Sequence, residues 1–212
     1  MANNLINKDL SSLIQVSRET IESLNEFKRI LLENNKNFNI ISSKDEEIIN
    51  VRHIQDSAQI IDLIDKKSKK CIDLGSGAGF PGIVISIIMK HNKISTKFDL
   101  YEKSPKKSDF LRFVSEKLEL NTQILNKNVF EEKNLEANSI TARAFKPVDQ
   151  ILKIMTINFK NYQNLILFLG KNGKQNFFEA FKVWDFEYKE HMSVTSNDSL
   201  IVSVKNIRKK IE

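Results

Sequence analysis

The first third of the chain shows a helical pattern of hydrophobic positions. After Ser17, a residue type that caps helix N-termini, apolar residues recur at spacings of three and four as far as Leu32. A second helical stretch is predicted from Asp45 to about Ile64. We therefore expect residues 1–68 to form a helical extension that packs with the rest of the chain as one unit.

From residue 69 to residue 212, short apolar runs alternate with stretches of helical period. The runs typical of strands lie at residues 71–74, 97–101, 123–125, 139–142, 164–169, 186–192 and 200–204. The helices between them are expected to begin near Pro81, Pro105, Pro147 and Gly173. Strands that alternate with helices at this spacing predict an α/β fold with a doubly wound, mostly parallel sheet.

The composition is that of an ordinary globular protein, since 41% of the 212 residues are hydrophobic and 28% are charged. The longest uncharged apolar run, residues 82–89, is far shorter than the roughly 20 residues that cross a bilayer, and residues 1–15 lack the pattern of a signal peptide. A single cysteine, Cys71, excludes an internal disulfide and a cysteine-rich zinc site. We expect a cytoplasmic protein without a membrane partner.

The net charge of 33 − 27 = +6 is carried by the second part of the chain, because residues 1–70 hold equal numbers of basic and acidic side chains. Positions 143–182 are strongly basic through Arg143, Lys146, Lys153, Lys160, Lys171, Lys174 and Lys182. A positive face of this kind suits a polyanionic partner such as nucleic acid. A lysine-rich surface exposed to solvent would give the same charge.

The glycines are unevenly distributed, and four of the six fall within eight residues, at Gly75, Gly77, Gly79 and Gly82. They lie between a predicted strand and a predicted helix, which is the context of a nucleotide-cofactor loop. Their spacing, D-x-G-x-G-x-G from Asp73, differs from the G-x-G-x-x-G of dinucleotide-binding enzymes and is typical of enzymes that use S-adenosylmethionine (SAM). A tight turn without a ligand is the alternative.

SAM has no pyrophosphate, so its loop needs exposed backbone beside the methionine and the ribose, here at Gly75 and Gly77. Asp73, at the end of the preceding strand, is placed for the cationic groups and hydroxyls of the cofactor. Glu102 follows the next predicted strand and is placed for the ribose hydroxyls.

The run Asp73-Leu-Gly-Ser-Gly-Ala-Gly-Phe-Pro-Gly82 resembles the motif of the RsmG family, also called GidB, and its Phe-Pro-Gly end is rare in other SAM enzymes. Three further segments resemble this family in order: Arg52-His53-Ile54-x-Asp56-Ser57, Lys106–Phe113 and Thr141-Ala142-Arg143-Ala144-Phe145. The resemblance implies a class I SAM-dependent methyltransferase that modifies N7 of a guanine in 16S ribosomal RNA, guanine 527 in the family. The implied partner is this RNA or the small ribosomal subunit, bound by a monomer.

Residue by residue, the resemblance implies that SAM is contacted by Gly75, Phe80, Val129, Phe130 and Arg143. The family usually has an acidic residue where Phe130 stands, so an aromatic ring would stack on the adenine here. The L-K-G segment of the family corresponds to residues 169–173, which makes Lys171 a candidate contact to RNA.

Transfer of a methyl group to N7 of guanine demands little acid–base chemistry, because this nitrogen has an in-plane lone pair and no proton. We expect no general base, and alignment of the lone pair with the methyl group is most of the catalysis. Methylation at C5 of a pyrimidine would need a cysteine nucleophile, and Cys71 begins a strand that is predicted to be buried. Amino-group methyltransferases of the N-P-P-Y type need adjacent prolines, which the chain lacks.

Arg143 is the strongest candidate for a functional side chain, since it follows a predicted strand and would bind a SAM carboxylate or an RNA phosphate. An exposed ion pair is its alternative role. Arg52, His53 and Asp56 are expected near the cofactor as candidate substrate contacts. Without the resemblance, a local ion pair between Arg52 and Asp56 is the simpler interpretation. A solvated helix face or phosphate contacts would both explain Lys103, Lys106, Lys107 and Arg112.

Three other functions are open at this point. A SAM enzyme that acts on a small molecule or a protein would have no affinity for RNA. A noncatalytic RNA-binding protein that has kept the loop would bind RNA without turning over SAM. An NAD-dependent oxidoreductase fits least, because the glycine spacing is wrong.

Overall fold

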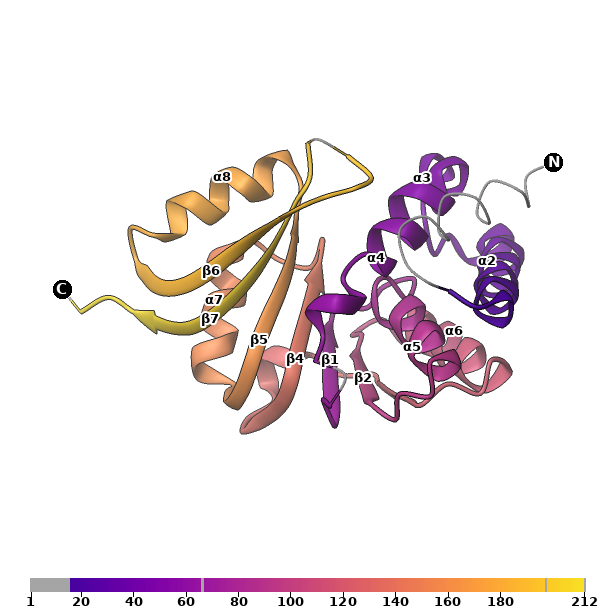
Figure 1. Cartoon of the computed structure of the whole chain (residues 1–212), viewed down its shortest axis with the longest axis horizontal. Coiled ribbons are helices and arrows are strands. Elements are labelled where there is room, and N and C mark those ends of the chain that lie inside the picture. The colour runs from indigo at the N-terminus through magenta and orange to yellow at the C-terminus, as the bar shows by residue number, and fades with distance from the viewer. Residues whose placement is uncertain (1–15, 66, 197, 212) are drawn as a thin grey trace.

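The apolar runs of the second part of the chain form one mixed sheet. The structure is a computed structural model, and it describes residues 16–65, 67–196 and 198–211. Within these residues seven strands follow the order β3-β2-β1-β4-β5-β7-β6, and β7 alone runs opposite to the other six (Figure 1). The strands are β1 (Lys70–Leu74), β2 (Lys97–Tyr101), β3 (Thr122–Leu125), β4 (Leu135–Arg143), β5 (Phe159–Leu169), β6 (Trp184–Met192) and β7 (Leu200–Lys209). The predicted mostly parallel sheet is confirmed.

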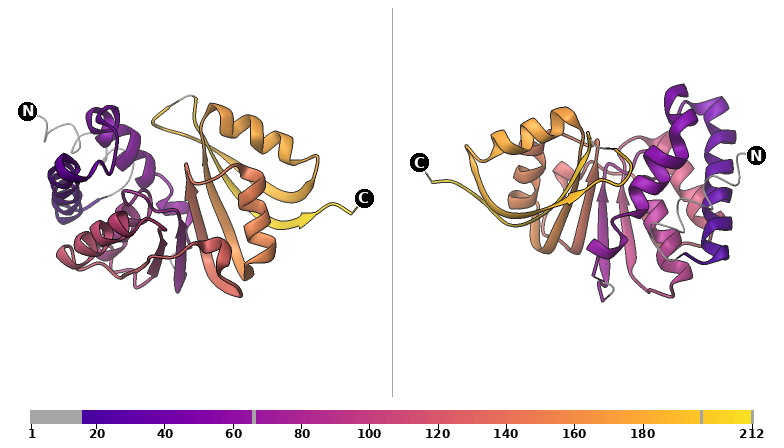
Figure 2. Two further views of the ribbon diagram at one scale, coloured as in Figure 1. Left: turned by 180° about the vertical axis from the view of Figure 1, so that it is seen from behind. Right: turned by 45° about the horizontal axis from the view of Figure 1, so that its top comes forward.

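Helices cover both faces of this sheet (Figure 2). They are α2 (Arg18–Phe38), α3 (Ser43–Ile48), α4 (Asp56–Ala58), α5 (Gly82–His91), α6 (Pro105–Lys117), α7 (Val148–Ile157) and α8 (Lys171–Ala180). A π-helix, η1 (Ile49–Gln55), joins α3 to α4, and two short 3₁₀-helices are η2 (Ile61–Leu63) and η3 (Val129–Glu131). None of the helices in the described residues is long and apolar enough to cross a membrane.

The hydrophobic core is divided by the sheet into two clusters. Side chains alternate between the faces of a strand, so on β1 Cys71 joins the cluster under α2, α5 and α6, whereas Ile72 joins the cluster under α7 and α8. Both faces of the central strands are therefore buried, which is why these strands read as continuous apolar runs in the sequence.

The helix start signals act as the sequence predicts. Ser17 is the N-cap of α2 and its hydroxyl accepts a hydrogen bond from the backbone N–H of Thr20 at 3.3 Å. Pro105 occupies the first turn of α6, while Pro81 and Pro147 are the N-cap residues of α5 and α7. These positions place no proline where a helical N–H is required.

Several elements differ from their predicted extents. The stretch predicted as one helix over residues 45–64 is broken into α3, η1, α4 and η2. Strands β4 and β5 begin earlier than predicted, because their polar first halves pair with each other, for example Ala137 with Tyr162. Helix α8 begins at Lys171, so Gly173 lies inside it. Apolar spacing detects neither a polar strand nor a π-turn.

The N-terminal helices share a core with the glycine loop. Phe27 on α2 is fully buried, and its ring lies 5.4 Å from the ring of Phe80 between centroids. Leu24 and Leu31 of the same helix belong to the cluster that contains α5 and α6. The division of the chain at residue 68 stays a prediction.

We expect Phe27→Ala to lower the free energy of unfolding by about 3–5 kcal/mol, because it removes a fully buried ring and leaves a cavity between α2 and the loop. Phe113→Ala, at a position 49% exposed on α6, is the matched control and is expected to cost less than about 1 kcal/mol. Urea unfolding of both variants measures the difference, and equal losses would contradict this packing.

Candidate active site

A cleft of about 1250 Å³ lies at the carboxyl ends of β1, β2 and β4. Its floor is built at the ends of these strands, from residues 75–78, 80, 101–103 and 143–146, and its walls include residues 39–43, 45, 52–53, 56 and 199–201. Ligands of open α/β sheets bind at this edge, where the strand order reverses on either side of β1. The volume exceeds the range usual for one small ligand, so the cleft has room for a second.

The glycine loop requires glycine for two separate reasons. Gly75, Gly77 and Gly79 have φ angles of 70°, 55° and 100°, in the left-handed region that favours glycine. A Cβ on Gly75 would also overlap the ring of Phe145, which packs directly on the loop. The loop therefore presents backbone to the cleft at Gly75 and Gly77, as the sequence predicts.

Asp73 lies behind the loop, 1% exposed, and its side chain does not line the cleft. One carboxylate oxygen accepts a hydrogen bond from the Thr141 hydroxyl at 2.6 Å, and the other accepts from the backbone N–H of Gly82 at 3.3 Å. Burial raises the pKa of Asp73 to about 6, although these hydrogen bonds oppose the shift. The structure does not bring this residue to the position beside a cofactor that the sequence predicts.

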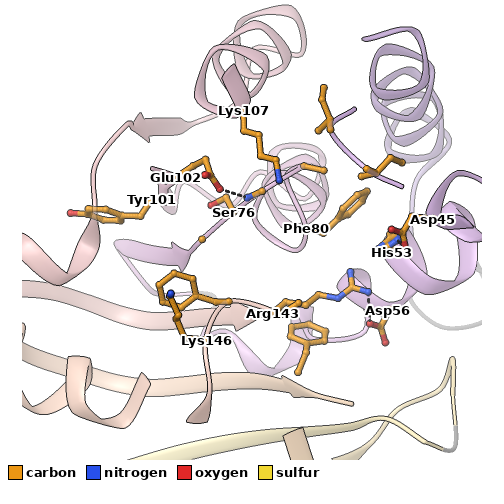
Figure 3. Close-up of a pocket in the computed structure, with 18 of the residues that line it drawn as sticks. Asp45, His53, Asp56, Ser76, Phe80, Tyr101, Glu102, Lys107, Arg143 and Lys146 are labelled. Atoms are coloured by element: carbon orange, nitrogen blue, oxygen red, sulfur yellow. Dashed lines mark hydrogen bonds and ion pairs between the residues drawn. The ribbon is translucent and has the colours of Figure 1, made fainter. Parts of the chain in front are cut away.

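Glu102 does reach the cleft, directly after β2. Its carboxylate accepts a hydrogen bond from the backbone N–H of Gly77 at 2.9 Å (Figure 3) and another from the backbone N–H of Ser104 at 2.8 Å. Because each carboxylate oxygen has two lone pairs, both oxygens keep capacity for a ligand hydroxyl. Glu102 thus holds the loop and presents an acceptor to the cleft.

Val129 and Phe130, on η3, line the same cleft. Val129 is buried, whereas Phe130 is 36% exposed, with its ring centroid 6.1 Å from that of Phe145. The ammonium group of Lys146 lies 5.9 Å from the Phe130 centroid, a cation–π distance. Two aromatic rings and one cation therefore stand beside the glycine loop.

Arg143 is the last residue of β4, and its side chain is 13% exposed in the cleft wall. The Nη2 atom lies 3.1 Å from Oδ2 of Asp56 and donates to the backbone carbonyl of Arg52. Phe168 packs under the guanidinium, with its centroid 5.7 Å from Cζ. The Nη1 atom is buried and has no hydrogen-bond partner among the described residues. Burial lowers the pKa of Arg143.

Arg52, His53 and Asp56 all line the cleft. The local ion pair between Arg52 and Asp56 is not formed, since Asp56 pairs with Arg143 instead and the Arg52 side chain reaches Ser199 Oγ at 3.5 Å. Asp56 is buried and faces the guanidinium of Arg143 at the end of β4, whereas Arg52 is exposed.

His53 is held by a ring and a carboxylate. Its imidazole stacks on Phe80 at 4.9 Å between centroids, and Nε2 lies 3.0 Å from Oδ1 of Asp45 (Figure 3). Burial and the nearby charge of Arg143 lower the pKa of His53 below its usual range, although Asp45 opposes the shift. Phe80 thus connects the buried Phe27 to the cleft wall.

A model of the family described as rRNA small subunit methyltransferase G (GidB) matches residues 20–202 of the chain. The chain belongs to this family. Two curated relatives are named Ribosomal RNA small subunit methyltransferase G. That of Pelagibacter ubique is 47% identical over 197 residues, 92% of both chains, and that of Rickettsia felis is 34% identical over 199 residues, 94% of this chain and 100% of the relative.

Solved structures share the fold at low sequence identity. A SAM-dependent O-methyltransferase of Thermotoga maritima has a TM-score of 0.54 at 18% identity, covering 81% of this chain and 74% of the other. M. jannaschii TYW2, solved in complex with AdoMet, has a TM-score of 0.51 at 14% identity, covering 75% and 76%. These findings confirm the RsmG resemblance, the class I methyltransferase fold and the predicted enzyme class, a SAM-dependent methyltransferase.

The basic candidates of this RsmG family member are divided between the cleft and the surface. Lys103 and Lys107 line the cleft, whereas Lys106 lies over the ring of Phe38 and Arg112 pairs with Asp109. Lys171 is not among the lining residues, although its neighbour Gly170 is. The structure therefore brings only part of the predicted phosphate-binding set to the site.

Sequence reasoning missed several lining groups. Tyr101, Lys127 and Phe145 belong to the cleft, and so do the segments 39–43 and 199–201. Phe145 belongs to the same motif as Arg143, so the sequence offered a signal for its place in the cleft. The two segments carry no motif, and only the fold brings them to the cleft.

We expect Gly75→Ala to lower the free energy of unfolding by about 2–4 kcal/mol, because the new methyl group would overlap Phe145 at a left-handed φ of 70°. The matched control is Gly173→Ala inside α8, where a Cβ meets nothing closer than Leu169 at 3.5 Å. This control is expected to stabilise the protein by about 0.5–1 kcal/mol. Urea unfolding distinguishes the two, and a Gly75→Ala protein as stable as the control would contradict the contact.

Proposed function

We propose that this chain transfers a methyl group from SAM to N7 of one guanine in 16S ribosomal RNA, at the position that corresponds to guanine 527 in the family. The observation that carries the proposal is the composition of the cleft. Exposed loop backbone and the Glu102 carboxylate stand on its floor, next to a rim of basic side chains. The rim consists of Arg52, Lys103, Lys107, Lys127 and Lys146.

The described residues fit SAM in three ways. Gly77 leaves space that a Cβ would fill, Glu102 keeps lone pairs for the ribose hydroxyls, and the Phe130 ring offers a stacking face for adenine. Arg143 would hold the methionine carboxylate, because its buried Nη1 is a charged donor without a partner among the described residues. When bound, SAM supplies an electrophilic methyl group on a positively charged sulfur.

The remaining work of the chain is to bind and orient the guanine. The N7 lone pair is available without loss of a proton, so no residue of the cleft has to act as a base, and orientation supplies most of the rate. The basic rim supports an RNA substrate, since phosphate contacts give most of the affinity for nucleic acid. A monomer is the expected state, and a ribosomal RNA substrate supports the cytoplasm as its compartment.

The test uses purified protein, SAM with a labelled methyl group, and either naked 16S RNA or small-subunit particles from cells that lack this protein. We expect one N7-methylguanine, mapped by chain cleavage at the modified base. The single-turnover rate should change little between about pH 6 and 9, because no group has to lose a proton.

A rate that rises tenfold per pH unit in this window would mean that the target atom carries a proton, and N7 would be the wrong atom. RNA binding without methyl transfer would favour the noncatalytic protein. Transfer to a protein or small molecule without affinity for RNA would favour the other class of SAM enzyme.

We expect Arg143→Ala to weaken SAM binding about ten- to a hundredfold, since a hydrogen bond between charged groups is lost. Its affinity for RNA and the salt dependence of that affinity should stay unchanged. If Arg143 instead contacts a phosphate, the slope of log K against log salt falls by about 0.7 to 0.9. Arg208→Ala is the control, because Arg208 forms an exposed pair with Asp185 on the far strands β6 and β7. Calorimetry with SAM and RNA binding at several salt concentrations decide between the roles.

A further inference from the structure

Asp56 is the most heavily bonded carboxylate in the wall of the cleft, and it is 7% exposed. Its Oδ2 atom lies 3.1 Å from Nη2 of Arg143. Its Oδ1 atom accepts hydrogen bonds from the hydroxyls of Thr195 at 2.8 Å and Ser193 at 3.3 Å, and from the side-chain amide of Gln59 at 2.8 Å. One carboxylate thus joins α4, the end of β4 and the segment that follows β6.

The π-helix η1 determines what else reaches Arg143. The backbone N–H of Asp56 donates to the carbonyls of Val51 and His53, and the bond to Val51 spans five residues. In an α-helix this N–H would take the carbonyl of Arg52, four residues back. Here the carbonyl of Arg52 accepts from Nη2 of Arg143 instead.

The guanidinium of Arg143 is therefore fixed at one end. Nη2 donates a hydrogen bond to the Arg52 carbonyl and forms an ion pair with the Asp56 carboxylate. Figure 3 shows the guanidinium between Asp56 and the ring of Phe80. The planar group then has one orientation, with the buried Nη1 left for a ligand.

We propose that Asp56 is a positioning residue that holds Arg143 in the orientation that binds the cofactor carboxylate, and that the hydroxyls of Ser193 and Thr195 hold Asp56 in turn. This inference rests on the proposed function, since it takes SAM as the ligand of Arg143. Asp56 itself does not have to touch the cofactor.

The same bonds connect the cofactor end of the cleft to its opposite wall. The backbone N–H of Val194 donates to the Gln59 side chain at 2.9 Å, and Arg52 reaches Ser199, which lines the cleft. A change in the orientation of Asp56 would therefore alter both the arginine and the wall formed before β7.

The experiment measures SAM binding by calorimetry for the wild type, Asp56→Asn, Arg143→Ala and the double variant. We expect Asp56→Asn to weaken binding about tenfold or more, because the amide cannot pair with the guanidinium. The double variant should bind as Arg143→Ala does, since Asp56 acts through Arg143. Asp185→Asn removes the partner of Arg208, an exposed pair at 2.5 Å, and is the control that leaves SAM affinity unchanged.

Steady-state kinetics separate positioning from a general loss of structure. Asp56→Asn should raise KM for SAM while kcat at saturating SAM stays near the wild-type value, and Asp56→Glu should recover part of the affinity. Additive losses in the double variant, or a normal SAM affinity in a folded Asp56→Asn protein, would overturn the inference and leave the proposed function intact. A wild-type protein that does not bind SAM would overturn both.

If Asp56→Asn does not fold, a variant that combines Ser193→Ala with Thr195→Val tests the inference. It keeps the carboxylate and removes two of the hydroxyl groups that orient it. This variant should bind SAM a few-fold more weakly than the wild type, with a normal affinity for RNA. An unchanged SAM affinity in a folded protein of this kind would overturn the inference.

Discussion

The hydrogen bonds of the Asp73 carboxylate hold together the centre of the molecule. A buried carboxylate is costly unless its oxygens are satisfied, and here one oxygen is bonded to Thr141 on β4 and the other to the first N–H of α5. A Cβ on Gly82 would stand 2.8 Å from this carboxylate, so glycine is needed there to admit it. Strands β1 and β4 and helix α5 are joined by this one side chain, and the glycine loop connects β1 to α5 beside it. The cleft has a fixed floor because this junction lies beneath it.

The loop is also held by side chains from three other parts of the chain. Phe145 packs on Gly75, and Glu102 accepts a hydrogen bond from the backbone N–H of Gly77. Residues that follow β4 and β2 thus each hold one residue of the loop that follows β1. Phe80 extends the same chain of contacts to Phe27 on α2. The N-terminal helices therefore act on the cleft through packing as well as through the residues they add to its wall. A backbone held in this way keeps its shape before a ligand arrives, which lowers the entropy that binding must overcome.

The sequence allowed the sheet, the glycine loop and most of the cleft residues to be predicted, because these depend on local patterns. Apolar runs, prolines at helix starts and the glycine spacing each determine the structure of residues that are close to them in the sequence. The orientation of Asp73 could not be predicted, since the sequence is the same whether a carboxylate at a strand end faces a ligand or the loop backbone. The wall at residues 199–201 depends on how β7 inserts between β5 and β6, and no short-range pattern encodes that order. The pairing of Asp56 with Arg143 joins two segments far apart in the sequence, so a rule for neighbours on one helix could offer only Arg52 as its partner.

The π-helix η1 limits which insertions and deletions the chain can tolerate between Ile49 and Gln55. A π-turn holds one residue more than the α-helical turn that could replace it, and each residue turns an α-helix by about 100°. Deletion of one residue just before Arg52 would allow a regular α-helix, in which the N–H of Asp56 competes for the Arg52 carbonyl that Arg143 uses. Substitutions on the solvent side of this segment, such as at the exposed Val51, leave that geometry intact. The length of the segment is thus constrained more tightly than many of its side chains, so insertions and deletions there are expected to be rarer than replacements.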